Sequence, residues 1–113
     1  MADLTLKNRI TTQHLGRNTT FRSGVRDVKP GDRVYLCQVD GVRFGVGCVL
    51  AVHILPFIEV TRDMLAKAHN PACQTFVGLW DELKRVYGQS FGLRSTVTVI
   101  DYSADAYDGD HNG

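Results

Sequence analysis

Basic and polar side chains that can contact a nucleic acid gather between residues 16 and 29 of this 113-residue sequence. The arginines offer a planar set of donors that matches a phosphate or a base edge, and they stay protonated at neutral pH. Threonine hydroxyls and an asparagine amide can contact a base or a sugar hydroxyl. The candidate binding residues are Arg17, Asn18, Thr19, Thr20, Arg22, Arg26 and Lys29. The alternative is a solvated loop in which Phe21, its one large apolar side chain, packs into the core.

The charge of the chain is distributed unevenly, although its formal net charge is only +1. Eight Lys and Arg stand against three Asp between Lys7 and Arg43, and from Asp101 onward there are four Asp without any Lys or Arg. A basic N-terminal half with an acidic end predicts a surface that faces a polyanion. The alternative is an ordinary solvated surface, where most charged side chains lie.

Metal, cofactor and thiol chemistry have little support. His69 and Cys73 are four residues apart, but no second pair has matching spacing, so we expect no metal. The usual dinucleotide, P-loop and nucleophile-elbow motifs are lacking, and we expect no cofactor. Cys37 and Cys48 fall on an expected core face and should be inert. Cys73 falls in an expected loop and is more reachable, but no base is fixed beside it, so a cysteine hydrolase is not expected.

Compartment and membrane signals point to a soluble cytoplasmic protein. The three cysteines form no CxxC pair, which favours a reducing compartment over a disulfide scaffold. No apolar run approaches the roughly 20 residues of a membrane span. The start, Met1-Ala2-Asp3, lacks the basic flank and apolar stretch of a signal peptide. We therefore expect no membrane partner, and the oligomeric state is not predicted.

The strongest local signal is a hairpin. Residues 34–39 are rich in β-branched and aromatic side chains, and Asp40-Gly41 follows them. A second strand over residues 42–54 would complete the hairpin, with glycines at 45 and 47 that permit bending or close approach. The expected cross-strand pairs are Tyr35 with Val46, Cys37 with Phe44 and Val39 with Val42. The face expected in the core is formed by Tyr35, Cys37, Val46, Cys48, Leu50 and Val52.

The elements around the hairpin complete a small α+β domain. Residues 16–32 are expected to be a long polar loop that ends in a turn at Pro30-Gly31. Residues 61–69 predict a short helix capped by Thr61, and residues 76–87 predict a second one between Thr75 and Gly88. A closing strand is expected over residues 95–102. These elements predict one domain over residues 1–102 and an acidic flexible tail over residues 103–113.

Two segments carry a resemblance to a known family. The run Gly16-Arg17-Asn18-Thr19-Thr20-Phe21-Arg22, followed by a Gly31-Asp32 turn into a strand, resembles the start of ASCH domains. The valine-rich strand, the helix that ends in Tyr87-Gly88 and the last strand also resemble ASCH domains, over roughly residues 4–102. This resemblance implies a PUA-like, strongly bent β-barrel with two short helices, and a cleft that binds RNA or nucleosides.

The resemblance also implies a catalytic set in some members, which are amidohydrolases of acetylcytidine. Their working residues are a loop Lys, a nearby Thr and a Glu before the late helix. Thr20 matches the Thr when Arg22 is aligned with the family Arg, but Arg17 or Asn18 stands where the Lys should be. Residues 70–74 carry no carboxylate. Arginine is a poor general base because its pKa exceeds about 12.

We therefore expect a module that binds RNA or a modified nucleotide, rather than an enzyme. The alternative is a nucleic-acid-processing hydrolase, either a deacylase of a modified base or a ribonuclease. In that hypothesis Arg17 would stabilise an oxyanion or phosphate, Thr20 would act as nucleophile or orienter, and His14 would be the base. A third hypothesis is a protein-interaction role, with the acidic tail as a nucleic-acid mimic.

Overall fold

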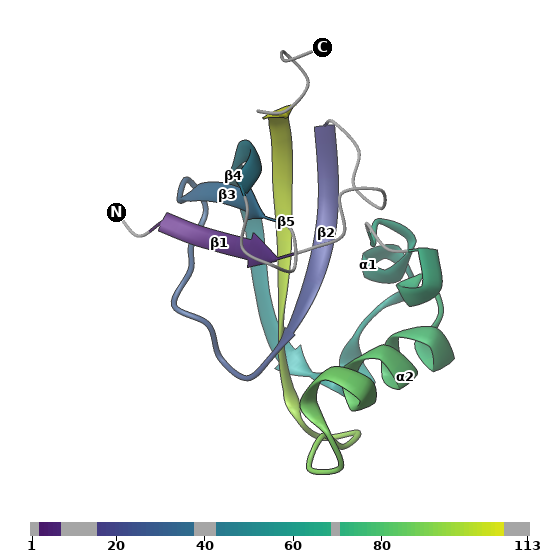
Figure 1. Ribbon diagram of the computed structural model, residues 1–113. Helices are drawn as coiled ribbons and strands as arrows, with labels where there is room; N and C mark the ends of the chain where they lie inside the picture. The colour runs from purple at the N-terminus through teal and green to yellow at the C-terminus, as the bar shows by residue number, and fades with distance from the viewer. Residues whose placement is uncertain (1–2, 8–15, 38–42, 69–70, 108–113) are drawn as a thin grey trace.

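A computed structural model describes the backbone of residues 3–7, 16–37, 43–68 and 71–107 (Figure 1). Five strands form one sheet in the order β1-β3-β4-β5-β2, and two helices pack against one of its faces. The strands are β1 (Asp3–Lys7), β2 (Gly16–Ser23), β3 (Arg33–Cys37), β4 (Arg43–Pro56) and β5 (Thr96–Tyr107). The helices are α1 (Arg62–Ala66) and α2 (Phe76–Tyr87), and short 3₁₀ turns lie at Phe57–Glu59 and Pro71–Cys73.

The sheet is antiparallel except at one edge, where β1 runs parallel to β3. In Figure 1, β1 and β3 run crosswise to β5 and β2. The long strand β4 makes this change of direction, since its register with β5 shifts after Val46 and again after Val49. Such bulges bend a strand. The predicted α+β class is confirmed, but no described pairing joins β1 to β2, so the sheet is not closed into the predicted barrel.

The hairpin of β3 and β4 forms as predicted, with a different register near its end. Tyr35 pairs with Val46, which confirms the prediction. Cys37 pairs with Arg43 instead of Phe44, because the register shifts between Leu36 and Cys37. The expected Asp40-Gly41 turn and the expected pair of Val39 with Val42 lie outside the described residues.

The predicted core face of this hairpin is wrong for most of its residues, although Cys37, which belongs to it, is buried. Val34, Leu36 and Val49 are buried, whereas Leu50 on the other face is 42% exposed. Both faces of these strands carry apolar side chains, so alternation alone does not decide which face is covered. The bulge near Leu50 then returns Val52 to the buried side, where it packs against the cluster around Val49.

The expected close approach of a glycine backbone occurs at Gly47. A Cβ atom at this position would lie 1.6 Å from the carbonyl oxygen of Ser103, so only glycine fits without movement. The Ser103 hydroxyl accepts a hydrogen bond from the backbone N–H of Cys48 at 3.2 Å. These contacts fix β4 against β5 beside the first bulge.

Both helices begin where their capping residues predict. The Thr61 hydroxyl accepts from the N–H of Met64, and the Thr75 hydroxyl accepts from the N–H of Gly78. α2 has the predicted bounds, but α1 ends at Ala66 rather than residue 69. It ends early because the carbonyl of Lys67 accepts a hydrogen bond from Thr19 in β2 at 3.0 Å. Helix and sheet are therefore joined at this point.

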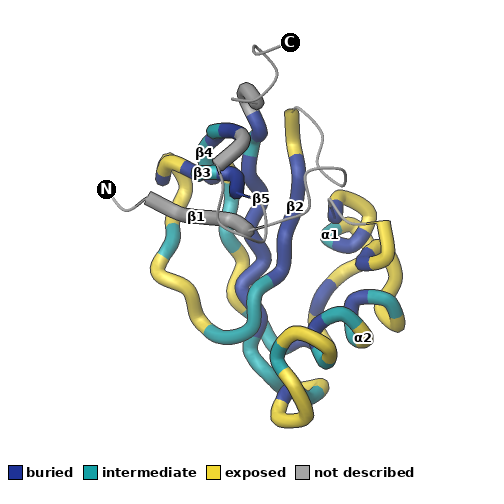
Figure 2. Tube along the Cα trace, in the orientation of Figure 1, coloured by how far each residue is buried: buried dark blue, intermediate teal, exposed yellow. Residues whose placement is uncertain are grey.

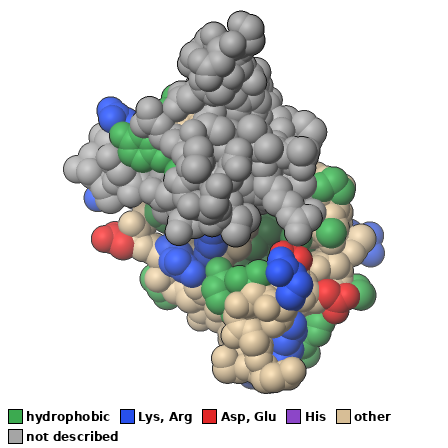
Figure 3. Space-filling view, in the orientation of Figure 1, with side chains coloured by type: hydrophobic (Ala, Val, Ile, Leu, Met, Phe, Trp, Pro, Cys, Tyr) green, Lys and Arg blue, Asp and Glu red, His purple; other side chains and the backbone are tan. Residues whose placement is uncertain are grey.

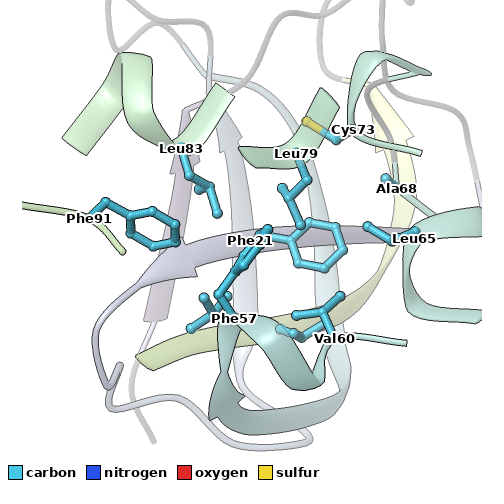
Figure 4. Packing of buried hydrophobic residues seen from close by; sticks show 11 residues of the cluster. Phe21, Phe57, Val60, Leu65, Ala68, Cys73, Leu79, Leu83 and Phe91 are labelled. Carbon is cyan, nitrogen blue, oxygen red and sulfur yellow. The ribbon is translucent and has the colours of Figure 1, made fainter. Parts of the chain in front are cut away.

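The main core lies between the sheet and the helices (Figure 4). Phe21 of β2 is buried at its centre, which confirms that this side chain packs into the core. Figure 4 shows Leu79 and Leu83 of α2 pointing toward it. Phe57 packs edge-on against Phe91, with ring centroids 5.6 Å apart. The buried members of this cluster are Phe21, Phe57, Val60, Leu65, Ala68, Cys73, Leu79, Leu83, Phe91, Val97 and Val99.

The last strand is longer than predicted. β5 runs to Tyr107, and Ala104 is buried and pairs with Gly16 of β2. The strand thus takes five residues from the segment predicted as a tail, and residues 108–113 lie outside the described chain. Figure 2 shows that β5 is buried along most of its length, because β2 and β4 flank it on both sides.

Candidate nucleic-acid interface

The first half of the predicted polar loop is the strand β2. Its register with β5 is regular from Gly16 to Ser23, so successive side chains point to opposite faces of the sheet. Phe21 marks the helix-side face, where α1 and α2 pack. The opposite face is called the loop-side face here, because the segment 24–32 packs against it through Val28. The prediction of a loop is wrong for residues 16–23. Their polar side chains are typical of a loop, and no local pattern indicates that the segment pairs with the distant strand β5.

The loop-side face of β2 carries three polar side chains in a row, Asn18, Thr20 and Arg22. Asn18 and Thr20 are almost fully buried, and each has an interior residue of β5 as its cross-strand partner. The Arg22 guanidinium donates to the Thr20 hydroxyl at 2.5 Å and to the carbonyl of Phe21 at 3.0 Å. This row therefore places polar groups within an otherwise apolar interior.

Burial lowers the pKa of the Arg22 guanidinium from its ordinary value, and the nearby positive charge of Arg26 lowers it further. The hydroxyl groups of Tyr87 and Tyr102 act in the opposite direction. The two effects that lower the pKa have ordinary causes: burial removes the guanidinium charge from water, and Arg26 places a like charge near it. Arg22 nevertheless stays protonated at neutral pH, because arginine starts from a pKa above about 12.

The helix-side face holds a separate cluster of Arg17, Thr19 and Asp101. Asp101 of β5 is 7% exposed and accepts from the Thr19 hydroxyl at 2.5 Å and from Arg17 at 3.2 Å. The Arg17 side chain remains 54% exposed. Asp101 was not among the predicted site residues. The signal that could have found it is a carboxylate that directly follows the β-branched run from Thr96 to Ile100.

The predicted catalytic candidates do not face the same space. Arg17 lies on the helix-side face and Thr20 on the loop-side face, since they are three positions apart on a regular strand. Thr20 is also only 2% exposed. The proposed base, His14, lies outside the described residues. The described geometry therefore does not bring these candidates together.

The segment after β2 is held against the sheet by specific hydrogen bonds. The Thr98 hydroxyl accepts from the N–H of Arg26 at 3.1 Å and donates to the carbonyl of Gly24 at 2.7 Å. The predicted turn is confirmed: the N–H of Asp32 donates to the carbonyl of Lys29, and Gly31 has a φ of 94°. That geometry is a type II turn, which requires glycine at this position.

The exposed charges of residues 16–33 are mostly positive. The buried carboxylate of Asp32 accepts from the N–H of Lys29 at 3.0 Å, so it is turned inward and serves the turn. Asp27 is the one exposed acid of this described segment. The exposed basic residues are Arg17, Arg26, Lys29 and Arg33. Figure 3 shows Lys and Arg side chains spread over the described part of one face of the molecule.

The other candidate chemistries find no support in the described chain. Cys73 was predicted to be reachable in a loop, but it is buried in the 3₁₀ turn Pro71–Cys73. Burial raises the pKa of its thiol to about 11, which makes it a poor nucleophile at neutral pH. Among the described residues, no three His, Cys, Asp or Glu side chains are placed to hold a metal ion. Neither α1 nor α2 is long and apolar enough to cross a membrane, nor is any other described helix.

Comparison with known proteins bears on the fold alone. No protein-family model matches the sequence, and no curated protein matches it. The fold is similar to the crystal structure of protein EF3133 from Enterococcus faecalis V583, described under the family model DUF984. The TM-score is 0.66 over 99% of this chain and 81% of that chain, with 13% sequence identity. At that identity the likeness shows a shared fold.

Proposed function

We propose that this protein is a divergent ASCH-like, PUA-like domain that binds RNA or a modified nucleotide. The observation that carries the proposal is the charge of residues 16–33, where four basic side chains are exposed against one acidic side chain. Exposed Lys and Arg supply most of the affinity for a phosphate backbone. The segment is also ordered by the Thr98 and Asp32 hydrogen bonds, so its basic side chains start from fixed backbone positions.

The row of Asn18, Thr20 and Arg22 supplies the second part of the proposal. Amide, hydroxyl and guanidinium groups can recognise a base edge or a sugar hydroxyl. The row begins beside Tyr102 and reaches the end of β2, where the basic segment starts. Phosphates would thus be held by the exposed basic residues, while a base or ribose would be contacted by Arg22, the half-buried member of this row, whose guanidinium the buried Thr20 hydroxyl holds in place.

The test is binding of a fluorescein-labelled single-stranded RNA, measured by anisotropy across a salt series. We expect binding at low salt that weakens steeply as salt rises, since counterions are released from the RNA. The triple variant Arg26→Gln, Lys29→Gln, Arg33→Gln should bind more weakly. It should also reduce the slope of log K against log salt by about 2, because each lost contact with a single strand contributes about 0.7.

A matched control has the same change in net charge elsewhere. Arg62, Lys67 and Arg94 are exposed and lie outside residues 16–33. Their triple replacement by Gln should leave both affinity and slope closer to the wild type. An equal loss from both variants would mean that only net charge matters, and absence of binding at low salt would refute the proposal.

The alternative is a hydrolase that acts on a modified base or on RNA. The observation that favours it is the 2.5 Å contact between the Arg22 guanidinium and the Thr20 hydroxyl, since a positive charge favours the ionised form of a neighbouring hydroxyl. Incubation with acetylcytidine and with RNA, followed by chromatography, decides between the two. Turnover by the wild type that Thr20→Val abolishes would replace the binding module by an enzyme.

A further inference from the structure

The half of β4 that follows its second bulge lies at an edge of the sheet. β3 pairs with the first half of β4 only, and Val49 ends that side through backbone hydrogen bonds with Gly31 and Asp32 at 2.9 and 2.8 Å. Beyond Val49, no other described strand pairs with this side, whereas β5 pairs with the opposite side as far as Pro56. Such an edge presents backbone groups with which a further strand can pair. Residues 50–56 are called the β4 edge here.

The backbone groups of Val52 and Ile54 face outward from the β4 edge. The N–H of Phe57 donates to the carbonyl of Ser95 at 2.8 Å, so Phe57 faces the β5 side. Successive residues of an antiparallel strand direct their N–H and C=O groups to opposite sides, and the register from Val52 to Pro56 has no shift. Val52, Ile54 and Pro56 therefore face away from β5. This agrees with the lack of an N–H in proline, which a sheet tolerates at an edge.

The β4 edge lacks the charges that usually block pairing with another chain. Residues 50–56 contain no Lys, Arg, Asp or Glu. Leu50 and Ile54 are 42% and 50% exposed, and Ile58, just beyond the strand, is 58% exposed. Within the described chain, no hydrogen bond reaches the outward N–H and C=O groups of Val52 and Ile54. An uncharged apolar edge of this kind is a surface on which another strand pairs.

The β4 edge is complementary to itself. In an antiparallel pair centred on His53, Val52 of one copy lies opposite Ile54 of the other, and each donates its outward N–H to the carbonyl of its partner. The same pairing places Leu50, at the bulge, opposite Pro56, which has no N–H, so the paired segment ends at the same point in both directions. No charged side chain meets a like charge across it. This symmetry favours a second copy over a strand of another protein.

We propose that two copies of this chain pair through their β4 edges, antiparallel and centred on His53, and form a dimer with one continuous sheet. The apolar side chains of Leu50, Ile54 and Ile58 would add contact area beside the paired backbones. The twofold axis of such a pair is perpendicular to the sheet, so the loop-side faces of both copies point the same way. If residues 16–33 bind RNA, which rests on the proposed function, the segments 24–32 of both copies would be presented on one side.

The register is tested by disulfide cross-linking of His53→Cys. Residues at position 53 would face each other in a pair without hydrogen bonds, with Cα atoms about 4.5 Å apart, which a disulfide can bridge. Mild oxidation should convert most of this variant to a covalent dimer on a non-reducing gel. The matched control is Ile54→Cys, which is also exposed but lies opposite Val52, so it should cross-link several-fold less. The wild type gives the background from its native cysteines.

Either of two results would overturn this register. One is cross-linking of His53→Cys no greater than that of the wild type, and the other is equal cross-linking of His53→Cys and Ile54→Cys. Both measurements are made without nucleic acid, so their failure leaves the RNA-binding proposal standing. Absence of RNA binding, in turn, leaves the dimer standing.

Self-association of the unmodified chain is tested by sedimentation velocity in reducing buffer, between about 1 µM and 1 mM. The wild type should pass from monomer to dimer over this range. Ile54→Lys should raise the dissociation constant about tenfold, because it places a charge on the edge of both copies. Val77→Lys, at an exposed apolar side chain of α2, is the matched control and should leave the constant unchanged. Circular dichroism verifies that each variant is folded.

The outcomes decide what occupies the β4 edge. A wild type that stays monomeric throughout, or a dimer that Ile54→Lys does not weaken, would overturn the proposal. A monomer that binds an added peptide with the sequence of residues 49–56 would also overturn it, since the edge would then take a strand from another chain without forming a dimer. Weakening by Ile54→Lys alone, together with the His53→Cys cross-link, would support the pairing.

Discussion

The carboxylate of Asp101 should stabilise the fold more than any exposed charge of the candidate interface. In the variant Asp101→Asn the side chain keeps its shape but loses its charge. One amide oxygen can still accept from the Thr19 hydroxyl, and the amide nitrogen then faces the Arg17 guanidinium, donor against donor. A hydrogen bond to a charged group contributes about 1.5–3 kcal/mol. We therefore expect the free energy of unfolding to fall by about 1–3 kcal/mol.

The matched comparison is Arg17→Met, which removes the other partner of Asp101. Arg17 is 54% exposed, so its ion pair is screened by water and should contribute at most about 1 kcal/mol. The Thr19 bond to Asp101 is buried and survives in this variant. The loss in Arg17→Met should therefore be clearly smaller than the loss in Asp101→Asn.

The assay is equilibrium unfolding in urea, followed by circular dichroism at neutral pH. With a slope of about 1–3 kcal/mol per molar urea, a loss of 2 kcal/mol moves the midpoint by roughly 1 M. The reasoning is refuted when Arg17→Met lowers stability as much as Asp101→Asn does, or when Asp101→Asn leaves the midpoint unchanged. Either result would mean that the buried Thr19 bond does not carry the interaction.

Three further predictions concern the core and the thiol. Phe21→Ala should cost about 3–5 kcal/mol in the same urea assay, because it empties the centre of the main core; a loss below 1 kcal/mol would contradict this packing. Gly47→Ala should lower the melting temperature sharply, since the new Cβ would meet the Ser103 carbonyl oxygen, whereas Gly92→Ala should be mild because the nearest atom to its Cβ would be the Ser95 Oγ at 4.0 Å, an ordinary contact. Similar melting temperatures for the two variants would argue against the close approach. Cys73 should react with iodoacetamide much more slowly in the folded chain than in urea at pH 8, as judged by mass spectrometry, because its pKa is raised to about 11. Equal rates in both states would show that the thiol is accessible.

Signals that lie within a few residues of one another were predicted from the sequence. Thr75 and Gly88 set both ends of α2, because a side-chain acceptor satisfies the first N–H groups and glycine stops the helix. Pro30-Gly31 set the turn before β3 in the same way. The candidate basic residues were also visible, since Lys and Arg are solvated wherever the chain places them.

The sequence did not indicate that β2 is a strand. This difference between prediction and structure changed the candidate site more than any other. Its polar residues read as a loop, whereas pairing with β5 buries Asn18, Thr19 and Thr20. The deciding contact, Thr19 with Asp101, joins residues 82 positions apart. No local pattern can indicate a partner at that distance. Burying a polar group costs free energy, and only the hydrogen bond to the distant partner offsets that cost.

The sequence by itself determined the α+β class, the caps, the turn and the basic composition of residues 16–33. Only the tertiary structure decided which face of each strand is covered and how the polar residues of β2 are divided. Strand alternation assigns Arg17 and Thr20 to opposite faces, but only the packing of α1, α2 and the segment 24–32 gives those faces their surroundings. The physical reason is that burial depends on contacts between distant segments, whereas caps and turns depend on neighbours in the chain.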